Sequence, residues 1–185
     1  MKINAQIEGE INNCVKSLRN GEYIIFPDET GWSIACDSAN TELIKKIIAS
    51  DQYNSHVLLL DESGRLNKFI KDIPDPVWDL VEFSTRPMNI ILGNVVNLPA
   101  LLLNEAGETT FRIAKEAFPQ ILAHKFGKPV FVASLESQIK PTPGAEGILN
   151  TPAYVVNLRI SAKTNPESLV IIRLSTGGRI EFIRK

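Results

Sequence analysis

The chain has 185 residues, of which 44% are hydrophobic and 22% are charged. This balance indicates a globular protein and excludes a disordered chain, and the length suits a single domain over residues 1–185. The 20 Lys and Arg residues are offset by 21 Asp and Glu residues, which leaves a formal net charge of −1. Binding to nucleic acid or to an anionic membrane therefore requires a local basic patch.

The cysteines and the N-terminal segment indicate the compartment. Cys14 and Cys36 form no CxxC pair, and we expect two small buried apolar residues rather than a disulfide. Residues 1–6 lack the apolar stretch of a signal peptide, and no apolar run approaches the length of a membrane span. We therefore expect a cytoplasmic protein without a membrane partner.

The first predicted elements lead into a polar loop. Residues 7–18 carry apolar side chains at helical spacing, and Gly21 stands where a helix would end. Residues 23–26 are a short β-prone run that stops at Pro27, and a loop with two acids, two hydroxyls and a tryptophan follows. Asn40 or Thr41 can cap the next helix, whose inner face we assign to four apolar residues: Leu43, Ile44, Ile47 and Ile48.

The rest of the chain alternates strands with short helices. Apolar runs predict strands at residues 57–60, 89–92, 111–113, 129–133, 154–158 and 169–174, and a turn at 175–178 leads into a closing strand at 179–183. Helices are expected at 66–70, from Pro76, and from Pro119 to Gly127. Residues 138–151 are expected to form a long loop, and loops of this length are usually functional or mobile. The sum is an α/β fold in which helices flank one twisted, mixed sheet of about seven parallel and antiparallel strands.

Motifs of established catalytic sites are absent from the sequence. The chain has no P-loop, GxGxxG, HExxH or GxSxG motif and no cluster of zinc ligands, so we assign no metal site. His56 and His124 lie far apart, and we expect a structural role for the first and a surface position for the second. Nothing in the sequence supports Ser-His-Asp catalysis.

Polar side chains gather at the ends of three predicted strands. Asp28, Glu29 and Thr30 follow the first strand, Arg112 lies within another, and Ser134 ends the strand before the long loop. A charge in a strand is costly to bury unless it meets a counter-charge. Either these groups converge on a small anionic or zwitterionic ligand, or they are turn hydroxyls with Arg112 paired to a structural acid. The residues alone leave both interpretations open.

The order of these segments resembles the YrdC-like family of threonylcarbamoyl-AMP synthases. The family's Pro-Thr-Glu-Thr-x-Tyr-Gly-Leu signature matches residues 27–34, and its Val-Arg-x-Pro-like strand matches the segment around Arg112. Its Gly-x-Pro-Leu, Ser-Ala-Asn and Pro-Ser-Thr-Ile-like motifs match residues 127–130, 134–136 and 167–170. Each motif is weak alone, but their order and spacing cover nearly the whole chain. The resemblance implies the YrdC-like fold.

The resemblance also implies an activity and a set of site residues. Members of this family combine threonine, bicarbonate and ATP into threonylcarbamoyl-adenylate, which feeds a tRNA modification, and they are also described as double-stranded RNA binders and putative translation factors. ATP and Mg²⁺ are thus the implied cofactors, and RNA (tRNA or double-stranded RNA) or a nucleotide is the implied partner. Ser134 and Thr142 are the implied nucleotide contacts. The implied substrate-binding residues are Asp28, Glu29, Thr30, Trp32, Arg112 and Ser134, with Arg112 suited to a threonine carboxylate.

The segment that should hold the phosphates departs from the family pattern. The family carries a Lys-x-Arg motif after the second helix, whereas residues 49–56 contain no Lys or Arg and include Asp51. The first Thr of the signature is Asp28, and the Asn of Ser-Ala-Asn is Glu136. One charge-assisted phosphate contact contributes about 1.5–3 kcal/mol, so removing two or three weakens ATP binding by several orders of magnitude unless something compensates.

Three hypotheses follow from this conflict. One is an active synthase with replaced phosphate ligands. Another is a small-molecule or metal-binding module in the same cleft, whose acids favour a cation. The hypothesis that we prefer is a divergent tRNA-modification-related factor that binds RNA or a nucleotide without catalysis. Its RNA patch would comprise Lys115, Lys125, Lys128 and Lys140.

Overall fold

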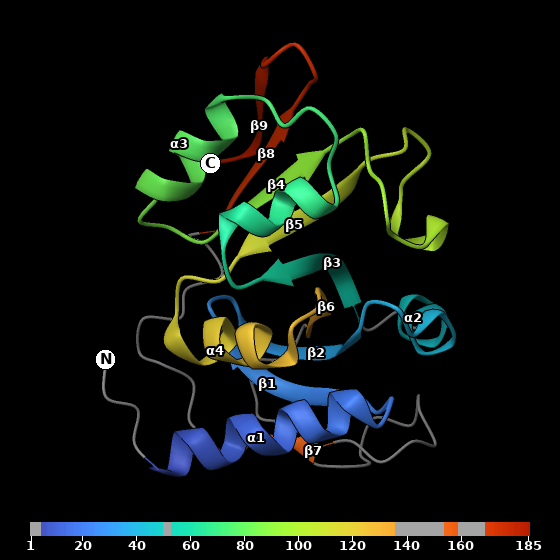
Figure 1. Ribbon diagram of the computed structural model, residues 1–185, viewed down its shortest axis with the longest axis vertical. Helices are drawn as coiled ribbons and strands as arrows, with labels where there is room; N and C mark the ends of the chain where they lie inside the picture. The colour runs from blue at the N-terminus through green and yellow to red at the C-terminus, as the bar shows by residue number, and fades with distance from the viewer. Residues whose placement is uncertain (1–4, 50–52, 136–153, 159–168) are drawn as a thin grey trace.

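One mixed sheet organises the protein. The computed structural model describes residues 5–49, 53–135, 154–158 and 169–185. Within these residues, nine strands form one sheet in the order β7-β1-β2-β6-β3-β5-β4-β8-β9 (Figure 1). The strands are β1 (Ile24–Asp28), β2 (Gly31–Asp37), β3 (Tyr53–Leu60), β4 (Met88–Leu92), β5 (Thr109–Ile113), β6 (Val130–Leu135), β7 (Tyr154–Val155), β8 (Val170–Leu174) and β9 (Ile180–Arg184).

The sheet is mixed, as the sequence predicts. The pairs β1–β7, β3–β5 and β4–β8 are parallel, and the other neighbouring strands are antiparallel. The helices are α1 (Ala5–Arg19), α2 (Thr41–Ile48), α3 (Pro76–Phe83) and α4 (Ala117–Phe126), with short 3₁₀ turns η1 (Ser63–Lys68) and η2 (Ala100–Leu102). The α/β class is therefore confirmed. None of the described helices is long and apolar enough to cross a membrane.

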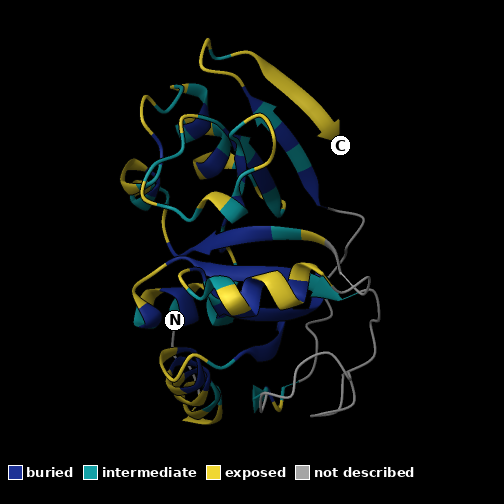
Figure 2. Ribbon diagram, turned by 90° about the vertical axis from the view of Figure 1, so that its right-hand side faces the viewer, coloured by how far each residue is buried: buried dark blue, intermediate teal, exposed yellow. Residues whose placement is uncertain are grey.

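Two apolar cores lie on the two faces of this sheet. One joins α1 and α4 to β1, β2, β3 and β6, and it includes Val15, Phe26 and Leu122. The other joins α2, η1 and α3 to the opposite face, and it includes Ile44 and Val81. The central strands are consequently buried on both sides, whereas β9 is exposed (Figure 2). Cys14 and Cys36 are buried free thiols, as predicted, and burial raises the pKa of both.

Local signals set several helix ends as expected. Asn40 caps α2, because its Oδ1 accepts a hydrogen bond from the Leu43 backbone N–H at 3.1 Å. Gly127 ends α4 in the left-handed conformation with φ +83°. Ile48 is a correction: its side chain is 46% exposed rather than on the inner face of α2. Ile48 follows the fully buried Ile47 by one residue, which places its side chain about 100° further around the helix axis.

The polar loop expected after Pro27 is a tight hairpin instead. Pro27 pairs with Trp32 and Asp28 pairs with Gly31, so only Glu29 and Thr30 connect β1 to β2. Proline is tolerated here because the parallel pairing of β1 with β7 ends two residues earlier. The predicted count of about seven strands is corrected to nine among the described residues, and the strand that the sequence did not predict is β2, at residues 31–37. The predicted loop at 138–151 lies outside the described residues.

His56 on β3 provides a pH-dependent test of this packing. Its ring stacks on Phe131 with centroids 5.3 Å apart, and burial lowers the pKa of the imidazole. The unfolded chain then binds a proton at higher pH than the native chain, so the free energy of unfolding falls as pH falls through about 6.5 and below. We expect His56→Phe to reduce this loss, as measured by urea denaturation between neutral and mildly acidic pH. Identical pH dependence in the two proteins would contradict the assignment.

Candidate functional site

The polar residues of the candidate site share one face of the sheet with the core beneath α1 and α4. Side chains along a strand alternate between the two faces. Phe26 of β1 and Val132 of β6 belong to that core, and the polar residues two positions further along these strands lie on the same face. On β2, β4 and β5, the residues that alternate with core residues of the opposite face add three more polar side chains to this face. The face therefore carries Asp28, Ser33, Asn89, Arg112 and Ser134.

Arg112 is buried and is held by side chains from two other strands. Its Nη1 donates to Asp28 Oδ2 at 3.0 Å, and its Nε donates to Asn89 Oδ1 at 2.8 Å. Glu29 Oε2 lies 3.8 Å from the same Nη1. The Arg112 side chain is only 2% exposed, so these partners replace the water that the charge loses on folding. The sequence left open whether Arg112 meets a ligand or a structural acid. In the structure, Arg112 is paired with acids of the protein itself.

The Asp28 carboxylate is saturated by donors from the protein. Its Oδ1 accepts from both the backbone N–H and the hydroxyl of Thr30, each at 2.7 Å. Its Oδ2 accepts from Ser33 Oγ at 3.0 Å and from Arg112. A carboxylate offers about four acceptor positions, and all are used here. Asp28 therefore closes the hairpin turn and anchors the guanidinium at the same time.

Glu29 ties the tip of the hairpin to the start of α4. Its Oε1 accepts backbone N–H groups from Lys115 at 2.7 Å and from Glu116 at 3.1 Å, directly before the first residue of the helix. A carboxylate at a helix N-terminus is favoured by the aligned peptide dipoles. Its Oε2 is buried and has no hydrogen-bond partner among the described residues. Glu29 thus joins the sheet edge to the helix layer.

The structure brings most of the predicted substrate-binding residues together. Asp28, Glu29, Thr30 and Arg112 are in direct contact, and Ser134 Oγ lies 3.4 Å from the Thr30 hydroxyl. Trp32 is separated from them, because it points to the opposite face and is buried in the core beneath α2 and α3. Alternation along β2 causes this separation. Thr142, Asp51 and Glu136 lie outside the described residues.

Sequence reasoning missed two members of this network. Asn89 satisfies the Arg112 Nε, and Ser33 donates to Asp28. Asn89 is the single polar residue of the apolar strand β4, and Ser33 stands between the apolar residues Trp32 and Ile34, so the sequence does contain a signal for both. Their partners could not be found in that way, because the pairing of Asn89 with Arg112 depends on the register between β4 and β5.

Three lysines of the predicted RNA patch each have a partner within the protein. Lys115 Nζ donates to the Val81 carbonyl at the end of α3, and Lys128 pairs with Asp37 at 2.9 Å. Lys125 Nζ lies 3.3 Å from the Glu8 carboxylate. Lys140 lies outside the described residues.

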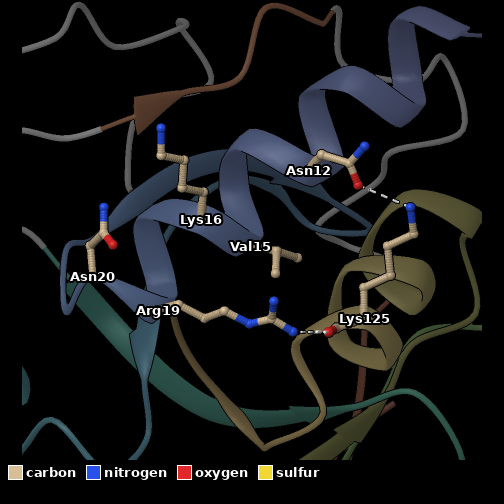
Figure 3. A pocket seen from close by; sticks show the side chains of 6 residues that line it. All are labelled: Asn12, Val15, Lys16, Arg19, Asn20 and Lys125. Carbon is tan, nitrogen blue, oxygen red and sulfur yellow. Dashed lines mark hydrogen bonds between the residues drawn. The ribbon is translucent and has the colours of Figure 1, made fainter.

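Lys125 instead belongs to a cationic groove between α1 and α4 (Figure 3). The groove has a volume of about 500 Å³. Arg19 reaches across it from α1, and its Nη2 donates to the Lys125 carbonyl at 3.0 Å. Sequence reasoning missed Lys16 and Arg19, although both stand in the last turn of the first predicted helix. The residues that line the groove are Asn12, Val15, Lys16, Arg19, Asn20 and Lys125.

The buried network offers little for redox, nucleophilic or metal chemistry. Its charged groups are one guanidinium and two carboxylates, and all three are nearly inaccessible to solvent. Among the described residues, no group of three His, Cys, Asp or Glu side chains could hold a metal ion. His124 is remote from the network, with a 73% exposed side chain, as expected for a surface position.

Comparison with known proteins decides the family. The family model for Sua5, YciO and YrdC proteins, described as "Telomere recombination", matches residues 16–185. The chain belongs to the Sua5/YciO/YrdC family. It is 25% identical over 133 residues to a threonylcarbamoyl-AMP synthase of Pseudoalteromonas translucida, covering 69% of this chain and 71% of that protein. A second threonylcarbamoyl-AMP synthase, from Photobacterium profundum, is 26% identical over 128 residues, which are 65% of this chain and 68% of that protein.

Solved structures of the Sua5/YciO/YrdC family share the fold. E. coli YciO superposes with a TM-score of 0.74 at 18% identity, covering 98% of this chain and 91% of YciO. P. abyssi Sua5, solved in complex with L-threonine, also gives a TM-score of 0.74 at 15% identity. This chain is covered completely in that match but spans only 55% of Sua5. The predicted family and its fold are therefore confirmed.

A double-mutant cycle tests the energetic role of the buried pair. Arg112→Met leaves the Asp28 carboxylate buried without its cation, and we expect it to cost about 3–5 kcal/mol of unfolding free energy. Combining it with Asp28→Asn removes the orphaned charge, so the double mutant should be about 0.5–3 kcal/mol more stable than the sum of the single losses predicts. Urea denaturation measures both quantities. Lys45→Met, which removes a cation from the exposed pair with Glu42, is the control and should leave the free energy of unfolding nearly unchanged.

Proposed function

We propose that this protein is a tRNA-modification-related member of the Sua5/YciO/YrdC family that binds RNA or a nucleotide and does not make threonylcarbamoyl-AMP. One observation carries the proposal, namely the buried ion pair between Arg112 and Asp28. The resemblance makes this arginine the cation for a threonine carboxylate. In this chain the protein's own carboxylate takes that place, at the position where the family signature has threonine.

Threonine binding is opposed by this ion pair. A ligand carboxylate would have to displace Asp28 from Arg112 and leave an uncompensated buried charge, which costs about 3–5 kcal/mol. The described residues also leave a ligand no open path to Arg112, because Asp28, Thr30 and Arg112 are all more than nine-tenths buried. A working threonine site would need this network to open.

The described residues do not fit an ATP–Mg²⁺ complex either. Adenylation needs cations or a metal at the reacting phosphates. The segment at 49–56 contains no Lys or Arg, and the buried network has more carboxylates than cations. Among the described residues, the cations that solvent can reach include Lys16 and Arg19 in the α1–α4 groove. Such cations suit the phosphates of a nucleic acid or nucleotide.

Synthase activity is the alternative, since the curated relatives are named threonylcarbamoyl-AMP synthases at 25–26% identity. Asp28→Thr distinguishes the two. We expect the wild-type protein to give no heat with L-threonine and to release no pyrophosphate from ATP, Mg²⁺, bicarbonate and threonine. Asp28→Thr frees Arg112 and should gain threonine binding in calorimetry. Asp28→Asn, which removes the charge but lacks the threonine hydroxyl, is the matched control.

Pyrophosphate release by the wild-type protein would contradict the proposal and establish the synthase. Absence of threonine binding in Asp28→Thr, with a native circular dichroism spectrum, would show that the ion pair is not what blocks the site.

RNA binding has its own test. We expect labelled duplex RNA or tRNA to bind at low ionic strength and to dissociate as salt rises, with a slope that reports the number of phosphates the protein neutralises. Lys16→Gln combined with Arg19→Gln should lower that slope by about 0.9 for each phosphate that is no longer neutralised. Lys71→Gln removes an exposed cation elsewhere and should leave the slope unchanged. Wild-type protein that binds neither RNA nor nucleotide at low salt would end this part of the proposal.

A further inference from the structure

One face of α1 lines most of the groove between α1 and α4. Five of the six lining residues stand three or four positions apart along α1 and the turn that follows it: Asn12, Val15, Lys16, Arg19 and Asn20. Val15 is buried, whereas the other four are exposed. Because Asn20 N donates to the Lys16 carbonyl at 3.0 Å, the row continues the helix and extends about 12 Å along its axis. Its two cations lie in the middle, with an amide at each end.

The two cations of this row have no carboxylate partner among the described residues. Arg19 Nη2 donates to the Lys125 carbonyl at 3.0 Å, which uses one of the five N–H donors of the guanidinium. Lys16 Nζ has no partner in this part of the chain. Both residues stand in the last turn of α1, where the helix dipole favours positive charge. A phosphate can therefore bind them without displacing a carboxylate, in contrast to Arg112.

The amides at the two ends of the row have hydrogen-bonding groups to spare. Lys125 Nζ lies 3.3 Å from Glu8 Oε1 and donates to Asn12 Oδ1 at 3.0 Å (Figure 3). This bond fixes the Asn12 amide with its oxygen on Lys125, so its NH₂ group is available to a ligand. The Asn20 amide has no partner among the described residues, and it offers both a donor and an acceptor.

This order of groups matches the order of groups along an unpaired nucleic acid strand. On the basis of the proposed function, we propose that the α1–α4 groove binds an unpaired segment of RNA. A phosphodiester group lies between Lys16 and Arg19, and the two nucleosides that flank it lie toward Asn12 and Asn20. Cations bind the phosphate oxygens through charge-assisted hydrogen bonds. Asparagine amides hydrogen-bond base edges, which an unpaired strand exposes.

A duplex and a free nucleotide each use only part of this row. In an A-form duplex, proteins reach mainly the phosphates and 2′-hydroxyl groups, so the amides lose their partners on the bases. The hollow of about 500 Å³ has the size of a small-ligand site, which suits single nucleotides of a strand rather than the side of a duplex. A free mononucleotide has one nucleoside and therefore reaches one amide. None of the described lining residues is aromatic, so phosphate contacts and hydrogen bonds must provide the affinity.

Fluorescence anisotropy of a short labelled RNA, as a single strand and in a duplex with its complement, tests the inference. We expect the single strand to bind about tenfold more tightly at low ionic strength, since the duplex forfeits one or two hydrogen bonds. Asn20→Ala should weaken single-strand binding about threefold to tenfold and leave duplex binding unchanged. Lys16→Gln should lower the salt slope for the single strand by about 0.7. Asn67→Ala, at an exposed asparagine of η1, is the matched control and should change neither affinity.

Nitrogen-15 NMR of the full chain locates the contact independently of affinity. The side-chain NH₂ signals of Asn12 and Asn20, assigned from their alanine variants, should shift as the single strand is added. The corresponding signal of Asn67 should not move. Native circular dichroism spectra of Asn20→Ala and Lys16→Gln are expected, because both side chains are exposed.

Three outcomes would overturn the inference. Single-strand binding that is unchanged in both Asn20→Ala and Lys16→Gln would place the RNA on another surface and leave the proposed function intact. Duplex RNA, adenosine monophosphate or polyglutamate that competes as strongly as the single strand would show a general site for anions. Wild-type protein that binds neither RNA nor nucleotide would end the proposed function together with this inference.

Discussion

A buried guanidinium must find hydrogen-bond and charge partners inside the protein, and Arg112 finds them on strands that lie far from it in sequence. Asp28 comes from β1 and Asn89 from β4, 84 and 23 residues away. Removing either leaves a charged or polar group without water or a partner. The tip of the β1–β2 hairpin and the start of α4 meet beside this group, since Glu29 accepts backbone N–H groups directly before α4 and lies 3.8 Å from Arg112 Nη1.

The Sua5/YciO/YrdC fold extends over nearly the whole chain. Within this fold, the charge of Arg112 is paired with Asp28 of the same chain. Function depends on the chemistry of a site rather than on the fold that carries it. The proposed loss of threonine binding therefore rests on this ion pair and not on the shared fold.

The cationic groove and the exposed strand β9 lie at opposite ends of the molecule. The groove runs between α1 and α4, beside the β7–β1 end of the sheet, and β9 forms the other end (Figure 1).

Features of short range follow from the sequence alone. The helix caps at Asn40 and Gly127, the apolar strand runs and the mixed α/β class depend on neighbouring residues and on periodicity. The order and spacing of several motifs, of which residues 27–34 carry the first, also indicated the family. The roles of Asp28 and Arg112 emerge only in the folded chain, because their meeting depends on strand order, register and twist across several strands. The sequence alone does not show the contact between Asp28 and Arg112, because this contact depends on where the sheet places β1 relative to β5.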